Sequence, residues 1–168
     1  EEVLGESNVA GIDVDPEGGV WVVRFDGSIS RYEENGHRLV QTDHHPPPAT
    51  DQAVPSRVVV AVSRDELWAS RSGGIGHYRD GQWRVLGAEE GLPHPMVWSH
   101  LVDASGRLWF GTYDGLVRVL DDGLERVAEE ALPDQRIYSL LEGPDGRIWV
   151  GTGQGIAILG EAGVEAVS

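Results

Sequence analysis

A motif built around tryptophan recurs four times along the chain and limits the folds that the chain can adopt. The third copy, residues 97–112, and the fourth, residues 137–152, align throughout, with Trp109 opposite Trp149. Two weaker copies surround Trp21 and Trp68. Successive motif tryptophans are 47, 41 and 40 residues apart. A period of this length predicts an array of small repeated structural units rather than one irregular domain.

Each repeat divides into four short apolar segments separated by turn residues. In the third repeat the segments and the turns between them are 97–103, 104–107, 108–113, 114–115, 116–120, 122–123 and 124–128. Alternating apolar residues joined by Asp-Gly pairs predict an antiparallel meander of four strands. A period of about 40–45 residues with this content is typical of propeller blades. The sequence therefore predicts an all-β fold, a β-propeller segment of four four-stranded antiparallel blades.

The repeats set the expected blade boundaries. We place blade 1 at about 8–43, a loop insertion at 44–56, blade 2 at about 57–87, blade 3 at about 96–130 and blade 4 at about 136–168. Three arrangements fit this phase: a closed four-bladed ring, part of a longer array, or two chains that complete an eight-bladed ring as a homodimer. We expect a longer array, because no blade shares strands from both termini. The motif tryptophans are expected to fill the space between neighbouring blades.

Charge and composition exclude several classes of partner. The chain has 13 Lys and Arg against 28 Asp and Glu, a net charge of −15, so its field repels phosphate backbones and nucleic acid is not an expected partner. It has no cysteine, which excludes disulfides and thiolate metal sites. No apolar run approaches about 18 residues, so we expect no membrane insertion by this segment.

The polar motifs do not predict catalysis, a metal or a cofactor. The six histidines, at positions 37, 44, 45, 77, 94 and 100, lack the spacing that brings two imidazoles onto one metal. The Asp-x-x-Gly segments at Asp15, Asp103 and Asp145 read as turns, because they lack the closely spaced ligands of a calcium loop. No Gly-x-Ser-x-Gly elbow is present.

Residues 91–116 closely resemble the two-component regulator propeller repeat, with Gly-Leu-Pro, Asp-x-x-Gly-x-Leu-Trp, Gly-Thr and Gly-Leu in order. The fourth repeat matches at 132–133, 144–152 and 155–156. The first two depart from the pattern, with Val22-Val23 and Ala69-Ser70 where we place the Gly-Thr pair. Residues 11–22 are also similar to the streptogramin lyase propellers. The main resemblance implies the extracytoplasmic ligand-sensing part of a bacterial hybrid histidine kinase or related regulator, often with saccharide ligands.

Meander topology selects the candidate binding residues. The linkers between blades and the second turn of each blade share one face of a propeller, and that face is expected to bind a ligand. Its candidate ligand-binding residues are His94, Trp98, Tyr113, Asp114, Tyr138, Arg24, Arg71, Gln154, His44 and His45, accompanied by Phe25 and Asp26. Aromatic, charged and amide groups together suit stacking and hydrogen bonding to a small polar ligand such as a saccharide.

Three functions remain open from the sequence. The first is a non-catalytic sensory module that binds a small polar ligand or a protein partner. The second is a lyase-like or hydrolase-like propeller enzyme, with His94 or His100 as the first suspects. The third is an assembly scaffold without a small-molecule site.

Overall fold

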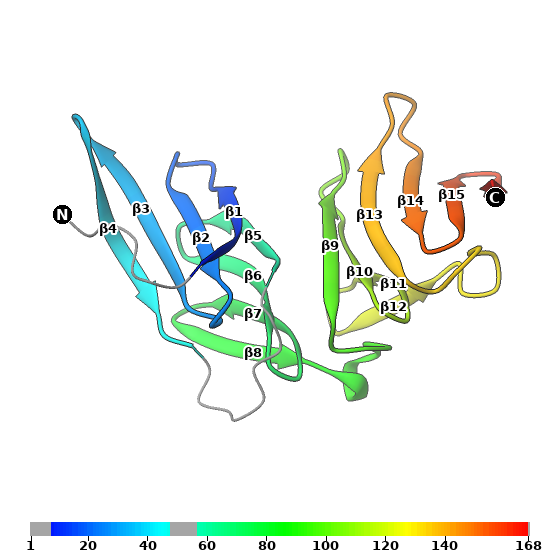
Figure 1. The fold of residues 1–168 in the computed structure, drawn as a ribbon, viewed down its shortest axis with the longest axis horizontal. Coiled ribbons are helices and arrows are strands. Elements are labelled where there is room, and N and C mark those ends of the chain that lie inside the picture. Colours follow the sequence, from blue (N-terminus) through cyan, green and yellow to red (C-terminus); the bar gives the residue numbers. More distant parts are fainter. Residues whose placement is uncertain (1–7, 48–56, 168) are drawn as a thin grey trace. The chain divides into compact units, whose positions relative to one another are not determined.

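Four antiparallel sheets make up the part of the chain that the computed structural model describes, residues 8–47 and 57–167. The strands of the first two sheets are β1 (Val9–Val14), β2 (Val20–Arg24), β3 (Ile29–Asn35), β4 (Arg38–His45), β5 (Val59–Ser63), β6 (Glu66–Arg71), β7 (Gly74–Arg79) and β8 (Gln82–Leu86). Those of the last two are β9 (Val97–Val102), β10 (Leu108–Thr112), β11 (Gly115–Val119), β12 (Leu124–Val127), β13 (Ile137–Glu142), β14 (Ile148–Thr152), β15 (Gly155–Gly160) and β16 (Gly163–Val167). Each sheet is a meander of four consecutive strands (Figure 1). The predicted fold class is confirmed.

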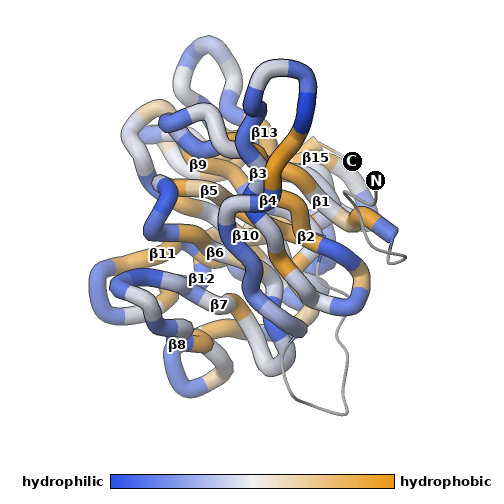
Figure 2. The backbone as a smooth tube through the Cα atoms, turned by 90° about the vertical axis from the view of Figure 1, so that its left-hand side faces the viewer, coloured by the Kyte–Doolittle hydropathy of each residue, from blue (hydrophilic) through white to orange (hydrophobic). Residues whose placement is uncertain are grey.

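The chain divides into two compact units, residues 1–85 and 86–168. The first unit contains the first and second sheets, apart from the last residue of β8, and the second unit contains the third and fourth. In both units the first strands of the two sheets are neighbours, β1 beside β5 and β9 beside β13. Hydrophobic residues lie mainly in the strands and hydrophilic residues mainly in the connections (Figure 2). No helix in the described ranges has the length and hydropathy to span a membrane.

The first sheet extends beyond the predicted boundary at residue 43. Strand β4 continues through His44 and His45, which pair with Ser30 and Ile29 of β3. The long β3 offers backbone partners to both residues, so they belong to the sheet and not to the loop that we placed at 44–56. Residues 48–56 of that predicted insertion lie outside the described residues.

The core of each unit lies between its two sheets. In the first unit Trp21 and Val23 pack against Val59, Leu67 and Ala69 of the second sheet. In the second unit a corresponding cluster joins Trp109 and Leu116 to the residues Ile137, Ile148, Val150 and Ala157 of the fourth sheet. The tryptophan face of one sheet thus covers the small aliphatic face of the next sheet.

Three of the four motif tryptophans are buried as predicted, and the fourth is not. Trp21, Trp68 and Trp109 belong to the buried residues, whereas Trp149 is 37% exposed. Ile148 and Val150 of β14 face the third sheet. Trp149 lies between them in the sequence, so its side chain projects from the other face of the strand. Alternation along β14 therefore leaves this indole on the outer face of the fourth sheet.

The Asp-x-x-Gly turns also divide into two kinds. Asp15 and Asp103 start their turns, and each carboxylate accepts the indole N–H of a tryptophan six residues later, at 2.9 Å from Trp21 and 2.8 Å from Trp109. The fourth turn starts at Gly143, two residues before Asp145, whose carboxylate binds Arg147 at the surface. Grouping Asp145 with the other two was therefore wrong, because Gly143 occupies the equivalent position and residues 145–148 read Asp-Gly-Arg-Ile, which is not an Asp-x-x-Gly segment.

Candidate ligand-binding surface

Two aromatic residues of the second unit occupy β-bulges at the start of their strands. Val97 and Ser99 pair with Thr112 and Gly111, which leaves Trp98 as an extra residue in β9. Tyr138 is the extra residue at the same place in β13. A bulge bends its strand and redirects the extra side chain, and bulges are frequent next to binding sites. The backbone therefore presents Trp98 and Tyr138 at the same end of two adjacent sheets.

The two bulge residues form the centre of a cluster of four rings. The rings of Trp98 and Tyr138 are stacked, with centroids 4.9 Å apart and an interplanar angle of 6°. Tyr113 meets Trp98 edge to face at 5.2 Å, and His94 lies 5.1 Å from Tyr113. We call these four residues the aromatic platform. Tyr113 and Tyr138 are 45% and 51% exposed, so the cluster is open to solvent.

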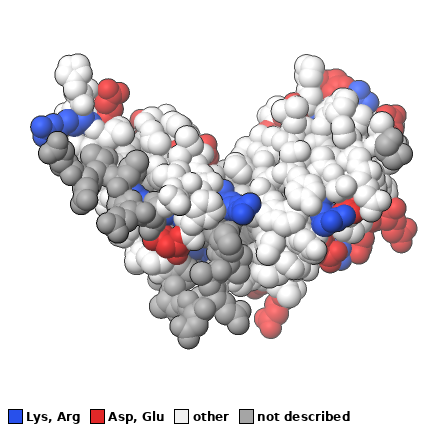
Figure 3. Space-filling model, viewed as in Figure 1, with Lys and Arg blue, Asp and Glu red and all other residues white. Residues whose placement is uncertain are grey.

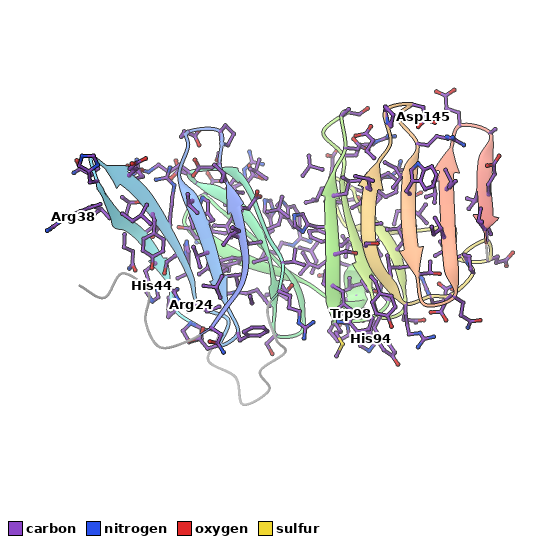
Figure 4. The ribbon with its side chains drawn as sticks, turned by 45° about the horizontal axis from the view of Figure 1, so that its top comes forward. Arg24, Arg38, His44, His94, Trp98 and Asp145 are labelled. Carbon is purple, nitrogen blue, oxygen red and sulfur yellow. The ribbon has the colours of Figure 1, made fainter. Side chains whose placement is uncertain are left out.

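The ring of His94 is held in place by the linker that carries it. Its Nδ1 accepts the backbone N–H of Met96 at 3.1 Å, so in the neutral ring the proton is on Nε2. His94 and Trp98 lie side by side at one end of the third sheet, whereas Asp145 lies at the opposite end of the same unit (Figure 4). This is the end at which the linkers and second turns were predicted to meet.

A charged pair borders the platform. Asp134 and Arg136 form a bidentate ion pair with two distances of 2.8 Å, and Gln154 donates to Asp134 at 3.0 Å. These bonds hold the pKa of Asp134 below its ordinary value. The hydrogen bonds and charge of Asp134 raise the pKa of Arg136, and the phenols of Tyr138 and Tyr113 are close enough to contribute. The pair therefore stays ionised beside the exposed tyrosines.

The prediction missed Asp134 and Arg136, although the repeat could have located them. Asp134 lies 40 residues after His94 and does the same work, since its carboxylate accepts the backbone N–H of Arg136 at 2.8 Å. A comparison of the linkers position by position, rather than a search for histidine and aromatic residues, would have found it.

Asp114 lies in the predicted turn but interacts with the outer strand instead of the platform. Its carbonyl accepts from Arg126 at 3.0 Å, and its carboxylate lies 3.8 Å from the same guanidinium. Gln154, in the corresponding turn of the fourth sheet, lies at the platform edge through its bond to Asp134.

The candidates in the first unit are mostly buried within it. Arg24 is buried and donates to Ser30 at 3.1 Å and to Tyr32 at 2.7 Å, and Ser30 bonds His44 at 3.0 Å. Arg24 is on β2 and His44 on β4 of the first sheet, with β3 between them (Figure 4). Hydrogen bonds inside the sheet therefore occupy the buried side chains of Arg24 and Ser30, whereas His44 is exposed on the outer strand of the sheet.

His45 and Arg71 are buried in the same unit. His45 stacks on Trp21 at 5.8 Å and meets the edges of Tyr78 and Trp83. Arg71 lies 4.1 Å above the ring of Trp83 and donates to the carbonyl of Gly27 at 3.0 Å. Burial lowers the pKa of Arg71. Both residues therefore bind other parts of the protein rather than solvent.

The register corrects the position of the Gly-Thr pair in the first two repeats. Strand β2 ends with Val23-Arg24 and β6 with Ser70-Arg71, at the places where β10 ends with Gly111-Thr112. Our alignment of Val22-Val23 and Ala69-Ser70 with Gly-Thr was one residue too early. Arg24 and Arg71 thus replace a threonine whose hydroxyl, in Thr112, caps the following turn by donating to Gly115 at 2.9 Å.

No cluster of three or more histidine, aspartate or glutamate side chains suitable for a metal ion occurs within residues 8–47 and 57–167. The polar groups near the platform are an ion pair, an amide and an imidazole, all of which can form hydrogen bonds.

A comparison of the sequence with models of known protein families gives a match in the fourth repeat. Residues 131–154, which hold Asp134, Tyr138, the Trp149 strand and Gln154, match the family model described as two component regulator propeller. The fourth repeat is thus similar to the regulator propeller repeat. The resemblance drawn from the sequence is therefore confirmed for the fourth repeat, one of the two that matched the pattern strongly.

Solved structures of other proteins have the same fold as this chain. It matches the extracellular domain of BT4673 from B. thetaiotaomicron, described as a hybrid two-component system, with a TM-score of 0.74 and 22% identity over 98% of this chain and 22% of that one. It matches BT3049 of the same organism, described in the same way, with a TM-score of 0.73 and 19% identity over 100% of this chain and 24% of that one.

The similarity to lyase propellers is confirmed at the level of fold. Virginiamycin B lyase from Staphylococcus aureus matches with a TM-score of 0.72 and 21% identity, over 96% of this chain and 56% of the lyase. A comparison with curated proteins finds no match. The chain thus spans 22% and 24% of the two sensor domains and 56% of the lyase.

Proposed function

We propose that this propeller segment is a non-catalytic recognition module that binds a small polar ligand on the aromatic platform, as the sensing part of a larger bacterial regulator. The observation that carries the proposal is the stacking of the half-buried Trp98 on the exposed Tyr138 at two successive bulges. Large aromatic groups are normally buried unless their surface is used. Here the backbone departs from regular pairing twice to present them.

The chemistry of the platform favours a saccharide. A pyranose ring has an apolar face, which stacks on an aromatic ring, and hydroxyl groups, which need donors and acceptors at its edge. The platform offers the rings of Tyr113 and Tyr138, while Asp134, Arg136 and Gln154 supply acceptors and donors beside them. Sites of this kind combine an apolar surface with a few oriented polar groups.

The sensory role rests on resemblance. The fourth repeat matches the regulator propeller model, and the fold matches extracellular domains of proteins described as hybrid two-component systems. In this proposal the segment lies outside the cytoplasm, and the output is carried by other parts of a longer protein.

A glycan-binding measurement tests the proposal. A panel of neutral and acidic oligosaccharides is titrated into the chain, and binding is followed by calorimetry and by tryptophan fluorescence. We expect at least one glycan to bind, and Trp98→Ala or Tyr138→Ala to weaken it about tenfold or more, the effect of losing roughly 1.4 kcal/mol of stacking energy.

The matched control is Phe25→Ala. Phe25 is an exposed aromatic residue in the second turn of the first sheet, the turn that corresponds to that of Tyr113, but it is not part of the platform. We expect this variant to bind like the parent chain. Binding that survives both platform substitutions, or a panel without any bound glycan, would contradict the proposal.

The enzymatic alternative is separated by following the ligand itself. A bound glycan recovered unchanged after prolonged incubation supports recognition without catalysis. Cleavage or elimination detected by mass spectrometry, and its loss in a His94→Gln variant, would favour the lyase-like function instead.

A further inference from the structure

Every arginine of the second unit has a carboxylate partner. Residues 86–168 contain five arginines and no lysine. In each pair a guanidinium nitrogen lies between 2.5 and 2.9 Å from a carboxylate oxygen: Arg107 with Asp103, Arg118 with Glu125, Arg126 with Glu129, Arg136 with Asp134 and Arg147 with Asp145. On the side shown in Figure 3, the basic side chains of this unit lie beside acidic ones. Within residues 86–167, an incoming anion therefore finds no arginine that lacks a carboxylate.

The acidic residues of the second unit outnumber its arginines. Besides the five that form these pairs, the unit contains nine more, at positions 89, 90, 114, 121, 122, 130, 142, 161 and 165. The excess gives the unit a negative field, in keeping with the net charge of −15 for the whole chain. A field of this sign repels an anionic ligand, and the repulsion acts over a Debye length of about 8 Å at 0.15 M salt.

The charged pair at the edge of the aromatic platform leaves no oxygen of Asp134 without a donor. Its Oδ1 accepts the backbone N–H and the Nε–H of Arg136, both at 2.8 Å. Its Oδ2 accepts from Nη2 of Arg136 at 2.8 Å and from Gln154 at 3.0 Å. Arg136 is the guanidinium beside the phenols of Tyr113 and Tyr138. Its charge is therefore compensated where a ligand would stack.

The imidazole of the platform adds no positive charge. Nδ1 of His94 accepts the backbone N–H of Met96 at 3.1 Å, so this nitrogen holds no proton in the observed geometry. The other members of the platform are an indole and two phenols. The platform thus offers rings and hydrogen-bonding groups without an excess of positive charge.

These groups suit a ligand hydroxyl better than a ligand carboxylate. A hydroxyl both donates and accepts, so it can bond to Asp134 or to Arg136 without disturbing their ion pair. A ligand carboxylate only accepts, loses hydration on binding, and competes with Asp134 for Arg136. Like charges placed side by side at an interface also lower the affinity.

We propose that the ion pair of Asp134 with Arg136 makes the aromatic platform selective for uncharged saccharides, and that saccharides carrying a carboxylate are rejected. The inference rests on the proposed function and adds the class of saccharide to it. Asp134 is the specificity-determining residue, because it occupies the guanidinium that an acidic sugar would need and adds a negative charge of its own.

Paired glycans test the selectivity. The probes are oligosaccharides of glucose, galactose and mannose, each accompanied by the counterpart in which the primary hydroxyl groups are oxidised to carboxylates. We expect at least one neutral probe to bind, and its oxidised counterpart to bind about tenfold or more weakly. Raising the salt from about 0.05 to about 0.5 M should narrow this difference, because salt screens the repulsion.

An Asp134→Asn variant tests the residue itself. The amide keeps an oxygen for the backbone N–H of Arg136 but replaces the second oxygen with a donor, which releases Nη2 of Arg136. We expect the preference for the neutral probe to fall by about tenfold, because the released guanidinium can form charge-assisted hydrogen bonds with the oxidised probe. Asp114→Asn is the matched control. It removes the same charge from the second turn of the third sheet, but Arg126 keeps Glu129 at 2.9 Å, so the preference should change much less.

The outcomes separate this inference from the proposed function. An oxidised probe that binds as tightly as its neutral counterpart, or a preference that Asp134→Asn leaves unchanged, would overturn the inference while saccharide recognition stands. Equal changes in Asp134→Asn and Asp114→Asn would also overturn it, because they would assign the preference to overall charge and not to the ion pair. A panel in which no probe of either kind binds would contradict the proposed function as well.

Discussion

At the scale of single residues, the buried carboxylate of Asp103 joins a turn to the core. Its side chain accepts N–H groups from Trp109, Ser105 and Arg107. Burial opposes ionisation, but these bonds outweigh it and hold the pKa of Asp103 below its ordinary value. Asp15 does the same with Trp21, and Arg31 is its buried counter-ion. In the first and third repeats, a single aspartate thus fixes both the turn and the indole.

Replacing Asp103 tests this role. Asp103→Ala leaves the buried indole N–H of Trp109 and the turn amides without an acceptor, and we expect the free energy of unfolding to fall by about 2–3 kcal/mol. Chemical denaturation measures the change. Asp145→Ala is the matched control, because the carboxylate of Asp145 binds only surface groups of Arg147 and should contribute much less. Equal losses in the two variants would contradict the role of Asp103.

His45 is the residue that should make stability depend on pH near neutrality. Burial lowers its pKa, Arg71 and His44 add to the effect, and Asp43 opposes it. The unfolded chain then binds a proton more readily than the folded chain below a pH of about 6.5. We expect the free energy of unfolding to decrease as the pH falls from 7.5 through 6.5, by up to about 1.4 kcal/mol per pH unit.

Denaturation curves recorded between pH 5 and pH 8 measure this dependence. His45→Phe preserves a ring between Trp21, Tyr78 and Trp83 and should flatten the profile. His37→Gln, a change at an exposed turn position, should leave the profile as it is. A profile that His45→Phe does not alter would assign the dependence to other groups.

At the scale of strands, the pairing of β9 with β10 explains why the third and fourth repeats contain Gly-Thr. A Cβ at Gly111 would lie 2.3 Å from the Oγ of Ser99 and 2.5 Å from the Cγ2 of Ile137 in the next sheet. The bulge that presents Trp98 is directly beside this glycine. The glycine therefore permits both the bulge and the close approach of β13, and the aromatic platform depends on it.

A pair of glycine substitutions separates these two contacts. Gly111→Ala would clash with Ser99 and with Ile137, and we expect a loss of about 1–3 kcal/mol. Gly151→Ala would meet only the side chain and backbone of Ser139, so its loss should be smaller. Thermal denaturation of the two variants at low salt and low concentration measures the difference. A larger loss of stability for Gly151→Ala would show that close contact with the next sheet is not the reason for glycine at position 111.

At the scale of the whole molecule, the two sheets of each unit pack together in the same way. The face of one sheet that carries the motif tryptophan packs on an aliphatic face of the next sheet. Trp21 packs with Val59 in the first unit, and Trp109 packs with Val150 in the second. On the outer face of the fourth sheet, Leu141 and Trp149 are exposed, because no other sheet of the second unit covers them.

The repeats determined much of what the structure contains. A period near 40 and alternating apolar residues predicted four meanders, since each strand residue faces one side of its sheet and each turn needs residues that accept its backbone angles. The same reasoning placed His94, Trp98, Tyr113 and Tyr138 at one end of their sheets. These are local or periodic properties, and the order of residues is enough to fix them.

Only the tertiary structure decided which of the candidates meet. The bulges at Trp98 and Tyr138, the ion pair of Asp134 with Arg136, and the burial of Arg24 depend on contacts between strands and sheets that no local pattern encodes. Trp149 shows the reason most clearly: its motif is the same as that of Trp109, yet a side chain is buried only when a neighbouring sheet covers it.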